Sequence, residues 1–446
     1  MRPGSNAVSI GIDFGTSNTV VALAGPDGQS RAIRFPHDGS SLSVYVTALC
    51  FWDERHGTSR LTQVEGGPYA VERFLEGLHA CRFIQSFKTF AASGSFQETR
   101  IFRERYRFED LLAAFLRTLV RHAEGSLDFG VERLVIGRPV RFAGHNPDEA
   151  LAMERYRAAF GRLGVQHAHY VYEPVGAAFF FARQLTRDAT VLVADFGGGT
   201  SDFSVMRFSR EGGQLRAAPL GHAGIGIAGD SFDARIVDRV VAPRLGKGGL
   251  YRSMGGKLLT LPVHPYANLS RWNQLALMKG SGELKELREL ARVALEPEPL
   301  ERFVDIVEHD HGFALYRAVS EAKVALSHAD GTRFRFAAGE SVIETTITRQ
   351  DFERWIAPDV ERIAATLDES LDQAGIGADA IDRVFLTGGT SFVPAIRRLF
   401  VGRFGEERLT SADQFESIAS GLALIGQDAD PAQWAARPSP GGSEPA

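Results

Sequence analysis

The sequence predicts an α/β protein that contains two related lobes. Apolar runs typical of strands alternate with helical patterns along the chain. A strand–turn–strand pattern with the letters Asp-Phe-Gly occurs twice, over residues 8–23 and 190–206. The two copies are separated by far more than the roughly 20–50 residues of a solenoid repeat. We therefore expect two lobes built around equivalent β-hairpins.

The other elements follow from the spacing of apolar residues. Helical spacing, as at Leu112, Phe115 and Leu119, predicts a set of helices along the chain. These helices are expected at 109–123, 147–164, 174–185, 230–242, 283–295, 314–328, 393–400 and 416–426. Short apolar runs predict strands at 134–136, 170–172 and 384–386. The irregular stretch 245–300 is expected to be an insertion.

The order of these elements suggests how the chain divides. We expect lobe I over residues 1–186, completed by residues 410–429, and lobe II over residues 187–409. Residues 230–328 are expected to form a helical insertion subdomain within lobe II. Residues 430–446 hold four prolines without periodicity, so this segment is expected to be a disordered tail.

Composition narrows the class of protein. The 446 residues include 44% hydrophobic and 24% charged residues, which is typical of a globular protein. The formal net charge of −5 gives no basic excess for nucleic acid or an anionic membrane. Neither a secretory signal nor a membrane span is apparent, so we expect a cytoplasmic protein. The two cysteines, Cys50 and Cys81, show no metal or redox spacing and exclude a disulfide scaffold.

The turn of the first hairpin has the chemistry of a phosphate-binding loop. Gly15 allows close approach of the backbone, and Thr16, Ser17 and Asn18 offer N–H and side-chain donors. Asp13 stands at the strand end, where it can hold a hydrated divalent cation. An ordinary polar hairpin tip explains one such turn equally well. The second copy, with Asp195 at the equivalent position, favours two turns that clamp the phosphates of a nucleotide from both sides.

Three further segments are candidates for the same site. Gly388-Gly389-Thr390 follows a strand and precedes a helix, where backbone N–H groups can meet a nucleotide. Glu173 stands at a strand end that opens a helix, and an ordinary helix-start glutamate is the alternative interpretation. Ser320, Lys323 and Ser327 share one helix face, although such a polar face is usually only solvated.

Other motifs are interpreted as coincidental. The GxGxxG pattern at 224–229 lacks the βαβ context of a dinucleotide fold, and no P-loop or GxSxG motif occurs. The pairs His309/His311 and His167/His169 are interpreted as solvated loop histidines, because further metal ligands are missing.

Together these motifs resemble the actin-like ATPase superfamily, and within it the ATPase domain of the DnaK-type seventy-kilodalton heat-shock chaperones. The first phosphate loop is 12–19 and the second is 194–202. The segments 172–178, 229–233, 320–327 and 385–394 resemble, in order, the linking motif, the glycine-acidic turn, the adenosine helix and the adenosine loop. The likeness spans residues 8–426 and implies a two-lobed fold with duplicated ribonuclease-H-like lobes around a central nucleotide cleft.

The resemblance also implies a set of site residues and cofactors. It implies ATP or ADP with Mg²⁺, and catalytic roles for Asp13, Glu173 and Asp195, with Asp13 and Asp195 holding the hydrated Mg²⁺. The implied nucleotide-binding residues are Gly15, Thr16, Ser17, Asn18, Gly197, Gly198, Gly199, Thr200, Gly229, Lys323, Ser327, Gly388, Gly389, Thr390 and Phe392. Protein partners, such as a co-chaperone or client, are compatible with the resemblance but unidentified.

The sequence departs from the family pattern at several positions. Val71 stands where the family has its catalytic lysine, and Lys88 resembles a different, later lysine that we expect at the surface. Val324 and Phe392 replace the two arginines that stack on adenine, and Phe392 can still stack. These differences predict nucleotide binding with slow hydrolysis.

The length suggests which branch of the family is nearest. After the last predicted helix the chain is too short for a client-binding β-sandwich of about 100 residues, so none is expected. YegD-like putative chaperones, which lack that domain, are the nearest match. The alternatives are a non-catalytic nucleotide-gated scaffold or filament protein, which the missing lysine favours, and a small-molecule kinase of the same superfamily. The kinase would need an aspartate base beside a sugar pocket, and no such motif is seen.

Overall fold

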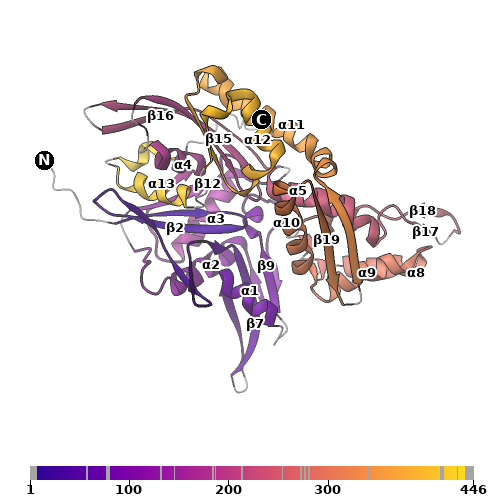
Figure 1. Ribbon diagram of the computed structural model, residues 1–446. Helices are drawn as coiled ribbons and strands as arrows, with labels where there is room; N and C mark the ends of the chain where they lie inside the picture. Colours follow the sequence, from indigo (N-terminus) through magenta and orange to yellow (C-terminus); the bar gives the residue numbers. More distant parts are fainter. Residues whose placement is uncertain are drawn as a thin grey trace, which may run out of the picture.

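The structure, a computed structural model, shows a mixed α/β fold with two central sheets (Figure 1). It describes residues 8–56, 59–76, 81–130, 133–144, 146–182, 185, 187–211, 214–253, 255–271, 274–275, 278–279, 282–339, 341–411, 416–428 and 430–436. No helix in these ranges is long and apolar enough to cross a lipid bilayer.

The first sheet has the strand order β13-β12-β1-β2-β3, with β6 also pairing with β2. Its strands are β1 (Ser9–Phe14), β2 (Asn18–Ala24), β3 (Ser30–Ala32), β6 (Tyr45–Val46), β12 (Arg133–Arg138) and β13 (His169–Tyr172). The central strand β1 is antiparallel to β2 and parallel to β12. The predicted hairpin over residues 8–23 is therefore confirmed.

The second sheet repeats this arrangement. Its order is β16-β15-β14-β21-β22, formed by β14 (Ala189–Phe196), β15 (Ser201–Glu211), β16 (Gln214–Ile225), β21 (Arg383–Thr387) and β22 (Leu409–Ser411). The central strand β14 is antiparallel to β15 and parallel to β21, as β1 is to β2 and β12. All eight residues of β14 are buried, which explains its continuous apolar run. The second predicted hairpin is also confirmed.

Two short helices lie between the sheets. The helix α4 (Glu173–Ala182) packs against α13 (Ser417–Gly426), and α13 in turn contacts β1, β2 and β12 while α4 contacts β14 and β15. The chain therefore returns to the first sheet after it has completed the second. Of the helix predicted over 174–185, the structure describes residues up to Ala182 as α4, and residues 183 and 184 lie outside the described residues.

Longer helices cover the outer faces of the two sheets. The first sheet packs against α2 (Phe108–His122) and α3 (Glu149–Gly161) through a core that includes Phe14, Phe115 and Tyr156. The second sheet packs against α11 (Arg349–Ala374) and α12 (Pro394–Phe404). Sequence patterns predicted α2, α3 and α12, but α11 was not predicted.

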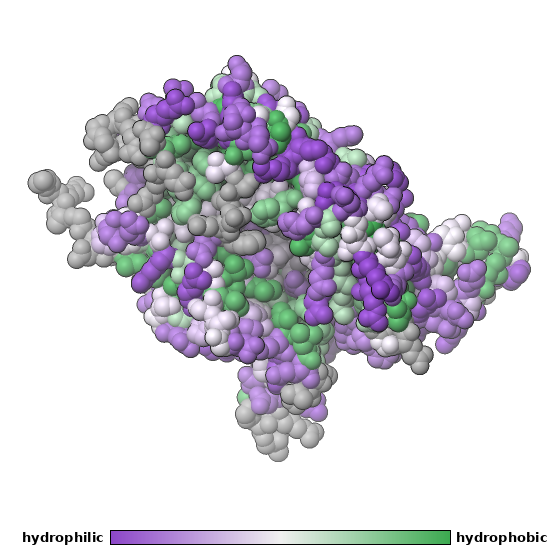
Figure 2. Space-filling view, viewed as in Figure 1, coloured by the Kyte–Doolittle hydropathy of each residue, from purple (hydrophilic) through white to green (hydrophobic). Residues whose placement is uncertain are grey.

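A further group of elements extends beyond the second sheet (Figure 1, right). It comprises α5 (Gly229–Ile236), β17 (Leu250–Arg252), β18 (Leu258–Thr260), α6 (His264–Leu269), α8 (Glu283–Val293), α9 (Pro297–Glu308), α10 (Gly312–His328), β19 (Gly331–Ala338) and β20 (Ser341–Thr348). A π-helical turn over Val237–Val241 continues α5. Figure 2 shows apolar side chains at the tip of the β17–β18 hairpin, where Leu258 and Leu259 are exposed.

A small sheet that the sequence did not predict projects from the first half (Figure 1, bottom). Its order is β8-β7-β9, formed by β7 (Ala48–His56), β8 (Ser59–Gly66) and β9 (Cys81–Gln85), and α1 (Gly67–Glu76) packs on it. Two short hairpins lie nearby in the chain: β4 (Phe35–His37) with β5 (Ser40–Leu42), and β10 (Thr99–Ile101) with β11 (Glu104–Tyr106).

The expectation of a disordered tail from residue 430 is wrong for residues 430–436. Pro431–Trp434 form a 3₁₀ turn, and the Trp434 side chain is buried. Its indole N–H donates a hydrogen bond to Asp428 Oδ2 at 3.1 Å, and the Ala436 N–H donates to the Tyr170 carbonyl at 2.8 Å. Burial of the apolar indole ring stabilises this segment beside β13, although its proline content suggested disorder. Residues 437–446 lie outside the described residues.

Candidate functional site

The two hairpin turns face each other directly. They have the same internal geometry, since the Gly15 N–H donates to the Asn18 carbonyl at 3.0 Å and the Gly197 N–H donates to the Thr200 carbonyl at 2.9 Å. A Cβ atom added to Gly198 would lie 2.5 Å from Ser17 Oγ. The backbone of one turn thus lies against a side chain of the other, and glycine leaves room for the Ser17 hydroxyl in its present position.

Four carboxylates gather beneath these turns. Asp13 is the penultimate residue of β1, Glu173 opens α4, and Asp195 and Asp202 are directly paired in the β14–β15 register. Burial, followed by the charge of Glu173, raises the pKa of Asp13 to about 8. Burial and the charges of Glu173 and Asp13 raise the pKa of Asp195 well above its ordinary value. The cluster is therefore strongly anionic when it is ionised.

Lys88 is the cation that faces this cluster, which corrects the expectation that it lies at the surface. It belongs to the 3₁₀ turn Phe87–Phe90 and is only 7% exposed. Its ammonium donates a hydrogen bond to Glu173 Oε1 at 2.8 Å and lies 5.8 Å from the centroid of the Phe14 ring. Burial lowers the pKa of Lys88, but the charges of Glu173 and Asp13 more than offset this effect and leave the pKa above its ordinary value. Lys88 is therefore charged at neutral pH.

A buried arginine holds the segment that carries Lys88. The guanidinium of Arg155, on α3, donates to the carbonyls of Phe90 at 2.8 Å, Ala91 at 3.0 Å and Phe96 at 2.6 Å. These bonds fix a stretch that has little regular secondary structure of its own. Arg155 is thus a positioning residue for Lys88.

The position expected for the family lysine lies in a different environment. Val71, on α1, packs in an apolar cluster with Cys50, Ala70 and Phe83. This cluster belongs to the small sheet β8-β7-β9. Lys88, rather than residue 71, brings an ammonium group to the carboxylates.

A second ion pair borders the Gly197–Thr200 turn. Lys323, on α10, donates to Asp233 Oδ2 at 2.8 Å and to the Gly229 carbonyl at 3.2 Å. The Asp230 N–H, at the start of α5, donates to the Gly198 carbonyl at 2.8 Å. The structure therefore places Gly229 and Lys323 beside the second turn. The Ser327 hydroxyl donates to the Lys323 carbonyl of its own helix at 3.2 Å.

The segment after β21 completes this group. Gly388 has a left-handed φ of 82°, and a Cβ atom there would lie 2.1 Å from the Phe196 carbonyl oxygen. The Thr390 hydroxyl donates to the Gly197 carbonyl at 3.4 Å. Phe392 and Val324 are both exposed, at 42% and 56%.

The donor set around the turns fits a hydrated divalent cation. Four carboxylates share a single buried lysine, and Asp202 Oδ2 is buried with no hydrogen-bond partner among the described residues. The other oxygen of Asp202 accepts from the Val140 N–H at 2.7 Å. Carboxylates and water are the ligands that Mg²⁺ prefers, so the excess negative charge matches that ion.

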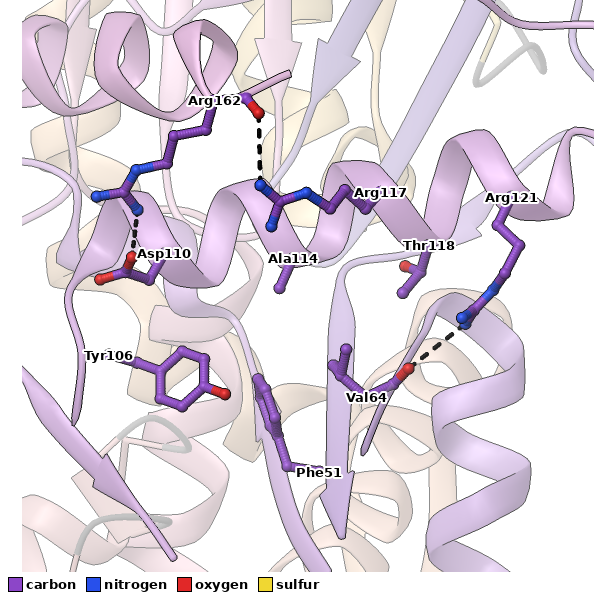
Figure 3. A pocket seen from close by; sticks show the side chains of 9 residues that line it. All are labelled: Phe51, Val64, Tyr106, Asp110, Ala114, Arg117, Thr118, Arg121 and Arg162. Atoms are coloured by element: carbon purple, nitrogen blue, oxygen red, sulfur yellow. Dashed lines mark hydrogen bonds and ion pairs between the residues drawn. The ribbon is translucent and has the colours of Figure 1, made fainter. Parts of the chain in front are cut away.

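A separate cavity of about 460 Å³ lies beside α2, away from these turns (Figure 3). Phe51, Val64 and Tyr106 contribute an apolar side. Arg117 donates to the Arg162 carbonyl at 3.4 Å. No sequence motif pointed to this cavity, because its lining comes from four separate segments of the chain.

The family model described as Hsp70 protein matches residues 86–248 and 303–433, which is more than half of the chain. The chain belongs to the Hsp70 family. Members of this family are ATPases with an actin-like fold that bind ATP with Mg²⁺, which agrees with the mixed α/β architecture and the carboxylate cluster. The matched ranges include Lys88 and the second turn, whereas the first turn lies before them and residues 249–302 lie between them.

Proposed function

We propose that this Hsp70-family protein binds MgATP between its two hairpin turns and hydrolyses it. The observation that carries the proposal is the direct contact between the two turns above a single buried carboxylate cluster. In this assignment the first sheet is the centre of lobe I and the second sheet is the centre of lobe II. The finer assignment to a YegD-like branch rests on the sequence resemblance and is part of the same proposal.

The phosphates are assigned to the two turns. Backbone N–H groups and hydroxyls of residues 15–18 and 197–200 would surround the β- and γ-phosphates. Gly229 and Lys323 would lie toward the ribose, and Ser327 beside them. Gly388, Gly389 and Thr390 would line the adenosine side, and Phe392 would stack on the base. A Cβ atom added to Gly389 would meet no atom within 4 Å, so this loop has room on that side.

The carboxylates are assigned to water and metal. Asp13 and Asp195 would hold a hydrated Mg²⁺ through its water ligands, and the ion would supply charge neutralisation for the phosphates. Asp195 orients the attacking water, whose oxygen forms a bond to the γ-phosphorus as the bond to the ADP oxygen breaks. The proton of that water passes to a carboxylate, and Asp195 is the assigned acceptor because burial raises its pKa above the ordinary value and so strengthens the ionised carboxylate as a base. Glu173 assists by holding Lys88.

We assign Lys88 as the lysine that meets the γ-phosphate. An ammonium group has three donors, and Glu173 takes one of them. The remaining donors are available for phosphate oxygens, where negative charge must be neutralised. Val71 led us to expect slow hydrolysis. With Lys88 in the role of the catalytic lysine, we instead expect turnover that depends on Lys88.

The test is a thermal-shift and single-turnover ATP assay on the purified protein. MgATP and MgADP should raise the melting temperature by linkage, and hydrolysis should require Mg²⁺. Asp195→Asn should lower the single-turnover rate, while Glu301→Gln, an exposed carboxylate on α9, should not. No melting shift at saturating MgATP would reject nucleotide binding. Binding without any turnover would favour a nucleotide-gated scaffold.

A further inference from the structure

The turn between α9 and α10 brings two histidines and an aspartate together. Asp305 and His309 are one helical turn apart at the end of α9, and His309 Nδ1 lies 2.8 Å from Asp305 Oδ1. His311, just before α10, has its Nε2 atom 3.9 Å from Asp305 Oδ2. The sequence showed only the His-x-His pair, and the ligand that was missing is Asp305.

We propose that Asp305, His309 and His311 bind a divalent transition-metal ion, with Zn²⁺ as the best match. Neutral imidazole nitrogens and one carboxylate oxygen form a common three-residue set for zinc, in which water takes the fourth position. Ca²⁺ and Mg²⁺ fit less well because they prefer oxygen ligands. The site is separate from the carboxylates of the nucleotide region and does not depend on the proposed ATPase function.

The geometry needs only small side-chain movements to close around an ion. One ligand atom from each residue lies within 4.8 Å of the other two. A tetrahedral ion with ligand bonds of about 2.1 Å requires its ligand atoms to be roughly 3.4 Å apart. The His309 side chain is 60% exposed, so it can rotate freely toward Asp305 and His311.

The surroundings support a site that is open on one side. Gly339, in the turn between β19 and β20, lies over it: a Cβ atom there would be 3.4 Å from Asp305 Oδ2 and 3.8 Å from His311 Nε2. Lys279, from a separate segment of the chain, pairs with Asp310 of this turn and is therefore already engaged. Among the described residues, no lysine or arginine forms an ion pair with Asp305.

The position of the site suggests a mechanical consequence. His311 immediately precedes α10, the helix that carries Lys323. Two residues later, the Phe313 ring packs edge-on against Phe74 of α1 and Phe83 of β9, at 5.7 Å and 5.3 Å between ring centroids. A bound ion would fix the α9–α10 turn and thereby the start of α10.

The experiment is a Zn²⁺ titration of the full-length, nucleotide-free protein by calorimetry at neutral pH. Wild type should bind one equivalent more than the Asp305→Asn/His309→Ala/His311→Ala variant. His264→Ala is the matched control, because His264 is also exposed and lies beside a carboxylate, Glu286, with no third ligand among the residues that the structure describes. That control should keep the wild-type stoichiometry.

A second readout guards against loss of folding. Without metal, the triple variant should melt at the wild-type temperature, and only wild type and His264→Ala should gain melting temperature with Zn²⁺. Replacement by Co²⁺ should give a visible absorption spectrum that the triple variant lacks. Equal Zn²⁺ stoichiometry in wild type and the folded triple variant would overturn the proposal, whatever the result of the ATP assays.

Discussion

The ammonium of Lys88 lies 2.8 Å from Oε1 of Glu173, and both side chains are almost fully buried. This pair crosses from the 3₁₀ turn after β9 to the start of α4, and it stands next to Asp13. Removing one partner of a buried pair leaves the other charge uncompensated. The pair therefore serves two purposes: the buried ammonium gives the Glu173 carboxylate a hydrogen-bond partner, and it holds a positive charge where the phosphates are assigned.

The first prediction concerns Lys88→Ala. Loss of one preorganised electrostatic contact at a reacting phosphate typically lowers the rate about 100- to 1000-fold. We expect a decrease of this size in single-turnover ATP hydrolysis, with a smaller effect on MgADP affinity because ADP lacks the γ-phosphate. Rapid-quench assays and a fluorescent-nucleotide titration measure the two quantities.

Two further variants make the Lys88 prediction specific. Lys285→Ala removes an exposed lysine on α8 and should leave the rate unchanged. Val71→Lys, combined with Lys88→Ala, should not restore the rate, because Val71 packs in the apolar cluster of the small sheet. Unchanged turnover in Lys88→Ala would show that the phosphate is neutralised by another group.

The two hairpins and their turns could be predicted because each is a local feature with a repeated motif. The Asp-Phe-Gly motif predicts the positions of the strand end, the turn and the acidic residue to within a few residues. The structure contains both predicted hairpins. The site as a whole depends on contacts between residues far apart in the chain. Lys88 and Glu173 are 85 positions apart, and no local pattern signals that the turn at Phe87–Phe90 is buried.

Two other elements escaped prediction for physical reasons. In the small sheet, β7 and β9 are joined through β8 and α1, and alternation in β8 is obscured by polar residues on both faces. The helix α11 contains Pro358, a residue that usually ends a helix. Tertiary packing of Phe352, Ile356 and Ile363 against the second sheet core outweighs that penalty.

The second prediction is a pH dependence that comes from the carboxylate cluster. Asp13 has a folded-state pKa of about 8 against 3.8 when unperturbed, so the folded protein binds this proton more tightly than the unfolded chain does. Without nucleotide, the contribution of Asp13 to the free energy of unfolding is therefore greatest at low pH. This contribution is lost as the pH rises from 3.8 toward 8. Asp13→Asn should flatten this decline and raise the melting temperature at pH 8 while it impairs hydrolysis.

Melting curves between pH 5 and pH 8 test this linkage, with Glu301→Gln as the control. Burial raises the pKa of Asp202 to about 7, so Asp202 contributes to the same loss of stability with rising pH. This contribution should persist in Asp13→Asn. Mg²⁺ with nucleotide should stabilise wild type more at pH 8 than at pH 6, since the ionised carboxylates are then available. A wild-type melting temperature that rises steadily over this range would contradict the prediction.

The third prediction addresses the contact between the two turns. In Gly198→Ala the new Cβ atom would lie 2.5 Å from Ser17 Oγ and 3.1 Å from Asp230 Oδ1, so either the Ser17 side chain must leave its place against the second turn or the turns must move apart. We expect weaker MgADP binding. Each loss of about 1.4 kcal/mol in binding free energy raises the dissociation constant about tenfold. Gly161→Ala, at the end of α3 with no atom near its added Cβ, is the control. Equal affinity in both variants would mean that the turns do not need this spacing.

The last prediction concerns the two helices between the sheets. A Cβ atom on Gly421, in α13, would lie 1.7 Å from the Gly176 carbonyl oxygen of α4, and both partners are backbone atoms that cannot turn aside. Gly421→Ala must therefore separate α13 from α4, and it should lower the free energy of unfolding by at least the roughly 1–3 kcal/mol of an overpacked core. Gly402→Ala, on the exposed side of α12 with no atom within 4 Å, should instead add about 0.5–1 kcal/mol from helix propensity. Urea denaturation midpoints compare the two variants. Opposite shifts would establish that α4 and α13 join the two halves of the protein through this glycine contact, and equal shifts would show that the helices pack differently.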